Sequence, residues 1–438
     1  MPPHAESSNR SELGHAMSTP DDPIVIDTQG DLLLIVHYNE DLTQYYRVSV
    51  SVLRKQSSYF DNLLDTTKFS EGIAVDANLA QLRMCHKDVA CVPSSALPAV
   101  TISDIGIGSA DARTNLCESS FRLLLEILHG CLQWSIVKTR GYVRPIILAL
   151  LAHYAEAFAA VPAVATEVHA LSEKGYIRGS ARPTKDVRED KSRQKIYAGL
   201  ILDLPDWVQT HSAALIIWGS KRWMGENDPS NSVDAEEYPW DYLSGGVEEE
   251  LHHRRCCVLN TLSSLQSHFL QLYSSRQTQC KLSYDSSPQC DSFQLGEMVR
   301  FFTRKGTLRL QSAMSGTYQD SEPFQGHLLK LVQSLKECPS YQLDGFHRHC
   351  GLRTRFIPRL ECVDLWSHVG LCLHCWKKER SQHSWVESPN REVWWCRVNK
   401  SLPRCGHGRF QAKEMYTSPC QDWTMNEILP LGRGNAGC

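Results

Sequence analysis

The sequence lacks the short motifs that mark the common nucleotide-binding and hydrolytic enzymes. It contains no glycine-rich loop ending in Gly-Lys-Ser/Thr and no G-x-G-x-x-G after a strand, so these phosphate-binding folds are not indicated. The G-x-S-x-G elbow of hydrolases, the kinase signatures and the H-E-x-x-H zinc motif are missing as well. We therefore expect a protein that is not an enzyme.

A strong net charge is also lacking. The chain has 46 Lys and Arg against 49 Asp and Glu, and its formal net charge of −3 is too small to attract nucleic acid or an anionic membrane over a distance. Residues 351–410 carry a local excess of eleven basic over five acidic side chains. A solvated basic surface is the simpler explanation of this excess, so we do not expect nucleic acid as a partner.

The sequence has little that would direct it to a membrane or to secretion. The apolar stretch 146–165 contains His153, Glu156 and Pro162, which predicts two buried helices rather than a membrane span. Met1–Glu6 has neither a basic n-region nor an apolar h-region. The 17 cysteines are an odd number, which argues against complete disulfide pairing. We expect a cytoplasmic or nuclear protein with reduced thiols.

Two apolar segments near the amino end predict a β-hairpin. The unbroken run Leu32–Val36 is typical of a strand that is covered on both faces, and Tyr45–Val50 supplies the aromatic and β-branched residues of an antiparallel partner. Two short helices are expected next. Ser51 is predicted to cap the first, and Ser57 or Ser58 the second.

The hydrophobic periodicity of the following residues is weak at first and then strong. Residues 70–98 have little periodicity and predict a long loop or insertion, whereas Ala99–Ile102 predicts a strand. Apolar residues at helical spacing then predict three helices, at 119–131, 145–160 and 163–174.

The order of these elements resembles that of a BTB/POZ domain. The segments that carry the resemblance are Val52-Leu53, Ser58-Tyr59-Phe60, Phe69-Ser70-Glu71, Val100-Thr101-Ile102 and Phe121–Gly130. The resemblance covers residues 22–175 and is greatest to the BTB-domain proteins of filamentous fungi. It implies an α+β fold, a helical cluster with a short β-sheet cap, that binds a protein partner. It also implies self-association as a homodimer, or docking to a cullin-type scaffold or a transcriptional regulator.

The flanking regions have different compositions. Residues 1–21 are rich in Ser, Pro and charged residues and predict a disordered tail. Residues 199–320 predict a mainly α-helical region, with one helix over 254–272 and another that Cys290-Asp291-Ser292 caps. His252–Arg255 is expected to form a solvated, polar helix end.

Residues 324–438 predict a Cys/His/Trp-rich C-terminal region that is partly disordered. Its metal-type residues are Cys338, His347, His349, Cys350, Cys362, His368, Cys372, His374, Cys375, Cys396, Cys405 and His407. Cys372 and Cys375 form a C-x-x-C pair that can grip one Zn²⁺ from a tight turn, and His349 with Cys350 is a candidate second pair. The alternative is a small core of buried thiols and ordinary histidines. No other cofactor is predicted.

Together these patterns predict a non-enzymatic adaptor or scaffold that acts through its BTB/POZ-like unit. The alternative from a different class is a zinc-binding protein whose basic, Cys/His-rich tail contacts nucleic acid.

Overall fold

The chain divides into two compact units. The computed structural model describes residues 19–20, 22–39, 42–86, 89–103, 105, 107, 111–132, 138–139, 142–177, 189–223, 238–282, 287–308, 324–361 and 369–387. The first unit comprises Met1–Arg178 and Glu236–Tyr238, and the second comprises Gly179–Ala235 and Pro239–Cys438. Apart from residues 19 and 20, the predicted disordered tail 1–21 lies outside the described residues, and so does 388–438 of the C-terminal region.

A four-stranded sheet forms the β-part of the first unit. Its strands are β1 (Ile24–Val25), β2 (Leu32–His37), β3 (Thr43–Val48) and β4 (Ala99–Ile102), in the order β1-β3-β2-β4. The predicted hairpin is confirmed, because β2 and β3 are antiparallel with Leu34 opposite Tyr46. Strand β4 returns parallel to β2, beside Leu33–Val36. A second, two-stranded sheet joins β5 (Lys138–Thr139) to β6 (Tyr142–Val143).

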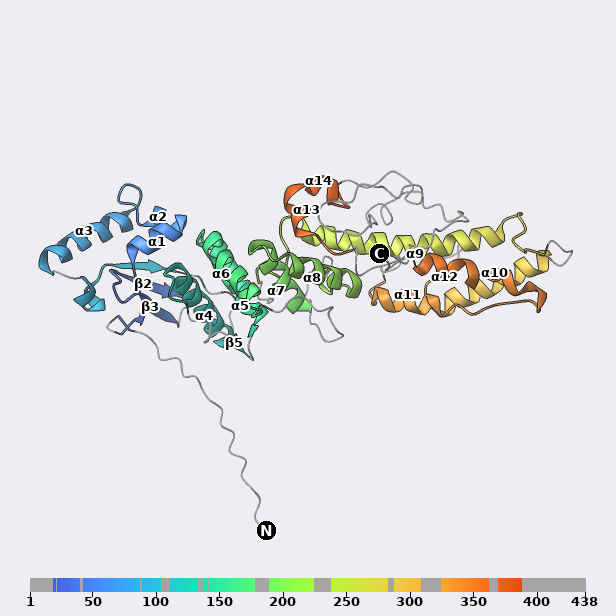
Figure 1. Cartoon of the computed structure of the whole chain (residues 1–438), viewed down its shortest axis with the longest axis horizontal. Coiled ribbons are helices and arrows are strands. Elements are labelled where there is room, and N and C mark those ends of the chain that lie inside the picture. Colours follow the sequence, from blue (N-terminus) through green and yellow to red (C-terminus); the bar gives the residue numbers. More distant parts are fainter. Residues whose placement is uncertain are drawn as a thin grey trace, which may run out of the picture. The chain divides into compact units, whose positions relative to one another are not determined.

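Six helices of the first unit accompany these strands (Figure 1). They are α1 (Val50–Gln56), α2 (Ser58–Leu63), α3 (Ser70–Cys85), α4 (Asp111–Leu128), α5 (Pro145–Ala157) and α6 (Val161–Glu173), with short 3₁₀ turns at Val89–Cys91 and Ser94–Ala96. Ser57 caps α2, since its Oγ accepts the Phe60 N–H at 3.2 Å. The predicted Ser51 cap was wrong, because α1 begins at Val50 and Ser51 lies inside the helix. Asp31 Oδ1 accepts the Val50 N–H at 2.8 Å instead.

Aromatic rings fill the centre of the first unit. Phe60 stacks on Phe158 with ring centroids 5.7 Å apart, and Phe121 meets Phe158 edge-on at 5.2 Å and Tyr154 at 5.6 Å. Phe60, Phe121 and Tyr154 are all fully or almost fully buried. Such offset and edge-on pairs stabilise a core beyond the area they bury.

The loop predicted over 70–98 is wrong for its first half, which is the sixteen-residue helix α3. Only Gly72, Val75 and Leu79 of this helix are buried. Their i, i+3, i+7 spacing gives a narrow contact stripe. Because apolar residues also lie on the exposed side, the periodicity of the whole segment is weak.

Among its described residues, the second unit contains helices and loops but no strand. Its helices are α7 (Glu189–Ile201), α8 (Pro205–Trp218), α9 (Val247–Ser274), α10 (Ser287–Arg304), α11 (Leu328–Lys336), α12 (Arg353–Glu361), α13 (Leu373–Lys378) and α14 (Arg380–His383), with a 3₁₀ helix, η5 (Phe346–His349). The longest is α9, along which α10 and part of α8 pack (Figure 1). A small sheet combined with many helices confirms the predicted mixed α and β class.

The solvated helix end predicted over His252–Arg255 is wrong for the two arginines, which are buried, whereas His252 is exposed. Glu250 and Arg254 are buried and paired, with Arg254 Nε donating to Glu250 Oε1 at 2.7 Å. Arg255 is buried as well and donates to the Ile216 carbonyl at 2.7 Å. The prediction was wrong because partners distant in sequence, at the end of α8 and beyond α12, satisfy these charges.

In the described part of the chain, no helix combines the length and the apolar character that a membrane crossing requires.

Candidate metal centre

The structure does not bring the four predicted zinc ligands together as one group. Cys350 is buried directly after η5, whereas His349 is exposed. Cys372 is the half-buried residue before α13, and Cys375 is buried inside that helix. Of the four, only Cys350 joins a group of metal-type side chains within the described residues. Other residues of the predicted set lie outside the described ranges, namely Cys362, His368, Cys396, Cys405 and His407.

Cys350 lies with two cysteines from elsewhere in the second unit. Cys280 is in the loop after α9, and Cys290 is in the first turn of α10. The three Sγ atoms lie within 4.8 Å of one another, and the Cys280 and Cys350 sulfurs are 3.7 Å apart. All three thiols are buried, and Leu282 packs against them. Three chain segments thus converge on one sulfur cluster.

Hydrogen bonds around the cluster hold these segments in place. Tyr273 of α9 donates its hydroxyl to the Cys350 carbonyl at 2.8 Å. Asp291, next to Cys290, accepts the backbone N–H of Gln279 at 2.7 Å. Arg355 of α12 donates to the Gln279 side-chain oxygen at 3.0 Å. The positions of the sulfurs are therefore set by contacts outside the cluster.

His347 is a buried imidazole that lies next to Cys280 of the cluster. Its side chain is 3% exposed, and its Nδ1 donates to Asp344 Oδ1 at 2.8 Å. Its Nε2 has no hydrogen-bond partner in the described part of the chain. The Asp344 hydrogen bond raises the pKa of His347, and the neighbouring Cys280 sulfur raises it further. A buried imidazole held at Nδ1 by a carboxylate, with Nε2 open, is the usual arrangement of a metal-ligating histidine.

The electrostatics of the three thiols differ. Burial raises the pKa of Cys290 to about 12, and the Cys350 and Cys280 sulfurs add to the effect. Burial also acts to raise the pKa of Cys280, but interactions with the Ser287 hydroxyl, the Leu282 N–H and the two thiols outweigh it, so this pKa is lowered to about 7. Ionisation of more than one of these thiols at such close range would need a cation beside them.

Helix α9 carries two cysteine–histidine pairs at i, i+4 spacing, an arrangement in which a histidine could activate a thiol. The Cys257 sulfur is 3.3 Å from His253 Nε2, and the Cys256 sulfur is 3.7 Å from His252 Nε2. Burial raises the pKa of both thiols, that of Cys257 to about 12. A nucleophilic cysteine requires the opposite shift, so neither pair has the electrostatics of an activated thiol.

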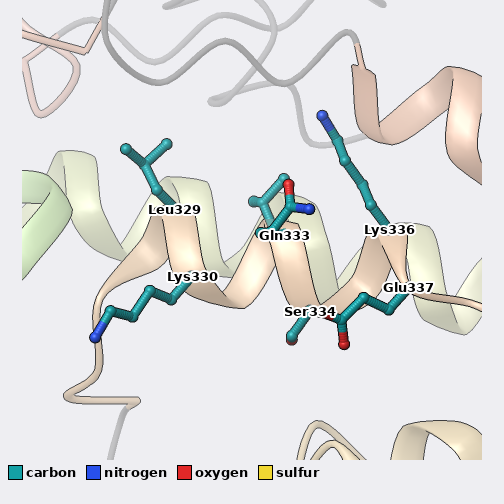
Figure 2. A pocket seen from close by; sticks show the side chains of 7 residues that line it. Leu329, Lys330, Gln333, Ser334, Lys336 and Glu337 are labelled. Carbon is teal, nitrogen blue, oxygen red and sulfur yellow. The ribbon is translucent and has the colours of Figure 1, made fainter.

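A surface hollow lies along α11. Figure 2 shows that its lining side chains come from this helix, including Lys330 and Lys336, and from Glu337 directly after it. A binding site for a small molecule usually combines an apolar wall with polar groups that converge from several elements. This hollow has no such convergence, and we assign it no function.

The signal for the sulfur cluster in the sequence was partial. His347 and Cys350 form an H-x-x-C pair that could have been preferred to His349 and Cys350, because it places both side chains on one turn. Cys290 was interpreted as part of a helix cap, but α10 already begins at Ser287. Cys280 precedes Cys350 by 70 positions, and no local spacing connects them.

Comparison of the chain with family models, curated proteins and solved structures finds no match.

Proposed function

We propose that the first unit is a protein-binding module of the BTB/POZ type and that the chain is a non-enzymatic adaptor or scaffold. One observation carries the proposal. The β2–β3 hairpin, the short helices α1 and α2, the returning strand β4 and the helices α4–α6 follow one another in the order that the sequence resemblance implies. The order and pairing of elements support a common fold, and the function assigned to that fold is our inference.

The exposed side of α3 supplies a surface that fits this role. Ile73, Ala77, Ala80 and Met84 are exposed and follow one another at four, three and four residues, which places them on one face of the helix. Ile73 is 55% and Met84 82% exposed. Contiguous exposed apolar side chains of this kind are typical of protein interaction sites. We therefore place the partner surface on this stripe, with an apolar surface of another protein as its ligand.

The opposite face of α3 explains why the helix can present the stripe. Val75 and Leu79 are buried, and a Cβ on Gly72 would meet the Asp65 carbonyl oxygen at 2.5 Å. The helix is thus anchored to its unit by close backbone contact on one side, which leaves the other side available to a partner.

The test uses the full chain and two defined probes, a second copy of the chain and a purified cullin amino-terminal domain. Sedimentation equilibrium measures the first interaction, and titration calorimetry measures the second. We expect binding to at least one probe, weakened at least about tenfold by the combined substitutions Ile73→Asp and Met84→Asp, because a charge must then be desolvated at each position. Val386→Asp, at an exposed apolar residue of the second unit, is the matched control and should leave binding unchanged.

The proposal fails if the unsubstituted chain binds neither probe. The assignment of the surface to α3 fails if the doubly substituted chain binds as tightly as the unsubstituted one.

A further inference from the structure

The sulfur cluster of the second unit has the dimensions of a tetrahedral metal site. Four ligands held about 2.3 Å from a tetrahedral Zn²⁺ lie about 3.8 Å from one another. The measured Cys280–Cys350 sulfur distance is 3.7 Å, and the Cys290 sulfur lies within 4.8 Å of both. The same distance is far longer than the roughly 2.05 Å of a disulfide bond, so the two thiols are not joined.

A fourth ligand lies next to Cys280, although its ring nitrogens are outside the 4.8 Å group that the three sulfurs form. His347 precedes Cys350 by three residues, and its side chain is more than nine-tenths buried beside Cys280. Asp344 orients the ring through Nδ1, so in the neutral ring the proton is held there and Nε2 presents a lone pair. That Nε2 is a buried polar atom with no partner among the described residues. An unsatisfied buried nitrogen is costly, and a metal ion would satisfy it.

The alternative is that Cys280, Cys290 and Cys350 are ordinary buried thiols, which pack as small apolar groups. Apolar packing accounts for their burial and for the contact with Leu282. It does not account for His347, whose ring is buried at the same place with one nitrogen held by a carboxylate and the other open. The combination of three thiols with one oriented imidazole is better explained by a metal.

We propose that Cys280, Cys290, Cys350 and His347 bind one Zn²⁺. Three sulfurs and one nitrogen in tetrahedral arrangement are typical of zinc, and a complete set of four protein ligands is typical of a structural site. The ion would join the loop after α9, the start of α10 and the segment after η5. It would therefore stabilise this part of the second unit, independently of the function proposed for the first.

The proposal is tested by measuring metal in the full chain, purified with reduced thiols from zinc-supplemented cells. We expect about one zinc per chain by mass spectrometry. Replacement by Co²⁺ should give thiolate-to-metal charge-transfer absorption and the visible bands of a tetrahedral site. A chain that holds no zinc and gives no such spectrum overturns the proposal.

Substitutions then identify the ligands. Cys290→Ser and His347→Ala should each reduce the bound zinc to a small fraction, while His347→Cys should retain it with an altered cobalt spectrum. The matched controls are His349→Ala, two residues away and exposed, and Cys338→Ser, buried in the same unit but outside the cluster. Both should retain zinc.

Loss of zinc in Cys372→Ser or Cys375→Ser, with retention in Cys290→Ser, would assign the metal to the C-x-x-C pair and overturn the proposal. If Cys290→Ser does not fold, the His347→Cys spectrum decides, because a cobalt spectrum unchanged by that substitution excludes His347 as a ligand.

Discussion

The two units of this chain are stabilised by different kinds of interior. The first encloses mainly apolar side chains, with the rings of Phe60, Phe121 and Phe158 at its centre. Its one buried arginine among the described residues, Arg47, donates to backbone carbonyls, including that of Gly30 at 3.0 Å. The second buries charged side chains, among them Arg193 and Arg254, together with acidic partners such as Glu248 and Glu250. Apolar burial has no direction, whereas a buried charge is tolerated only where a partner of suitable geometry meets it.

The buried charges of the second unit also connect segments that are far apart in sequence. Arg193 Nη2 donates to Glu248 Oε1 at 2.6 Å, which links α7 to α9. Arg254 donates to the Val369 and Gly370 carbonyls at 2.9 Å, and Glu250 accepts the Trp385 N–H at 3.0 Å. The second unit is therefore organised by contacts between buried charges of opposite sign, and removing one partner there leaves a buried charge without its counter-ion.

The largest effect is expected from the aromatic core of the first unit. Phe60→Ala should lower its free energy of unfolding by about 4 kcal/mol, through lost transfer free energy and the cavity left behind. Hydrogen exchange of peptides from β2 and α2, recorded at increasing urea concentrations, measures the loss of stability in this unit alone. Tyr59→Ala is the control: this ring is 37% exposed, and about 1 kcal/mol is expected. A loss for Phe60→Ala below about 1 kcal/mol would contradict the assignment of the ring to the core.

The corresponding change in the second unit removes one member of a buried ion pair. Glu250→Ala leaves Arg254 and the Trp385 N–H without their acceptor, so we expect a loss of about 3 kcal/mol. Urea unfolding followed by tryptophan fluorescence reports mainly on this unit, because all but one of the 11 tryptophans follow residue 200. The neighbouring, exposed Glu249 provides the control, and Glu249→Ala should change stability by less than about 0.5 kcal/mol.

A double substitution sharpens the comparison. If the cost of Glu250→Ala comes from the unpaired Arg254, then Glu250→Leu combined with Arg254→Met should recover most of it, because both charges are then absent. Equal losses in the single and double variants would show instead that the carbonyl contacts of Arg254 hold the segment around Gly370 in place.

The difference between the units also determines how much could be predicted from the sequence. In the first unit, Leu32–Val36 and the residues around Phe60 carry their own patterns, since apolar runs and helical spacing are local properties of the chain. The helix α3 was missed because a stripe as narrow as Val75 and Leu79 gives a weak periodic signal. Here the errors concern single elements, namely the cap of α1 and the helix α3.

In the second unit the decisive contacts are not local. Arg254 was interpreted as a surface charge, and its partners near Val369 lie more than a hundred residues further along. The Cys280 and Cys350 sulfurs are likewise close in space although the two residues are 70 positions apart in sequence. Spacing rules detect candidate ligands that share one turn, such as Cys372 and Cys375. They cannot detect a candidate site that the fold assembles from three segments.

The stability of the second unit should also depend on pH, through the buried His211. His211 of α8 is 3% exposed, and burial together with the Lys195 charge lowers its pKa to about 3. The folded state therefore keeps this ring neutral, while the unfolded chain takes up a proton below its ordinary pKa of 6.5. Its contribution to stability is complete above that value and is lost as the pH falls. From about pH 7 to about pH 5 the loss is about 2 kcal/mol.

The measurement compares the chain with His211→Gln by urea unfolding at several pH values in this range. Other histidines titrate in both proteins, so the difference in pH dependence isolates His211. We expect the stability of the variant to fall about 2 kcal/mol less than that of the unsubstituted chain. Parallel curves would show that the ring is accessible to protons in the folded state.

The smallest effect is expected in the first unit, from the hydrogen bonds of one buried hydroxyl. The Ser57 side chain accepts the Phe60 N–H at 3.2 Å and donates to the Phe158 carbonyl at 2.6 Å, so one hydroxyl caps α2 and connects it to the segment after α5. Ser57→Ala should cost about 1 kcal/mol, the typical value of a helix cap. Ser58→Ala is the matched control, because Ser58 is the exposed first residue of the same helix, and no more than about 0.5 kcal/mol is expected. Hydrogen exchange of the α2 peptide in urea measures both.

Equal losses for the two variants would mean that helix propensity, and not the cap, determines the stability of α2. A loss for Ser57→Ala as large as that for Glu250→Ala would remove the contrast between the two interiors.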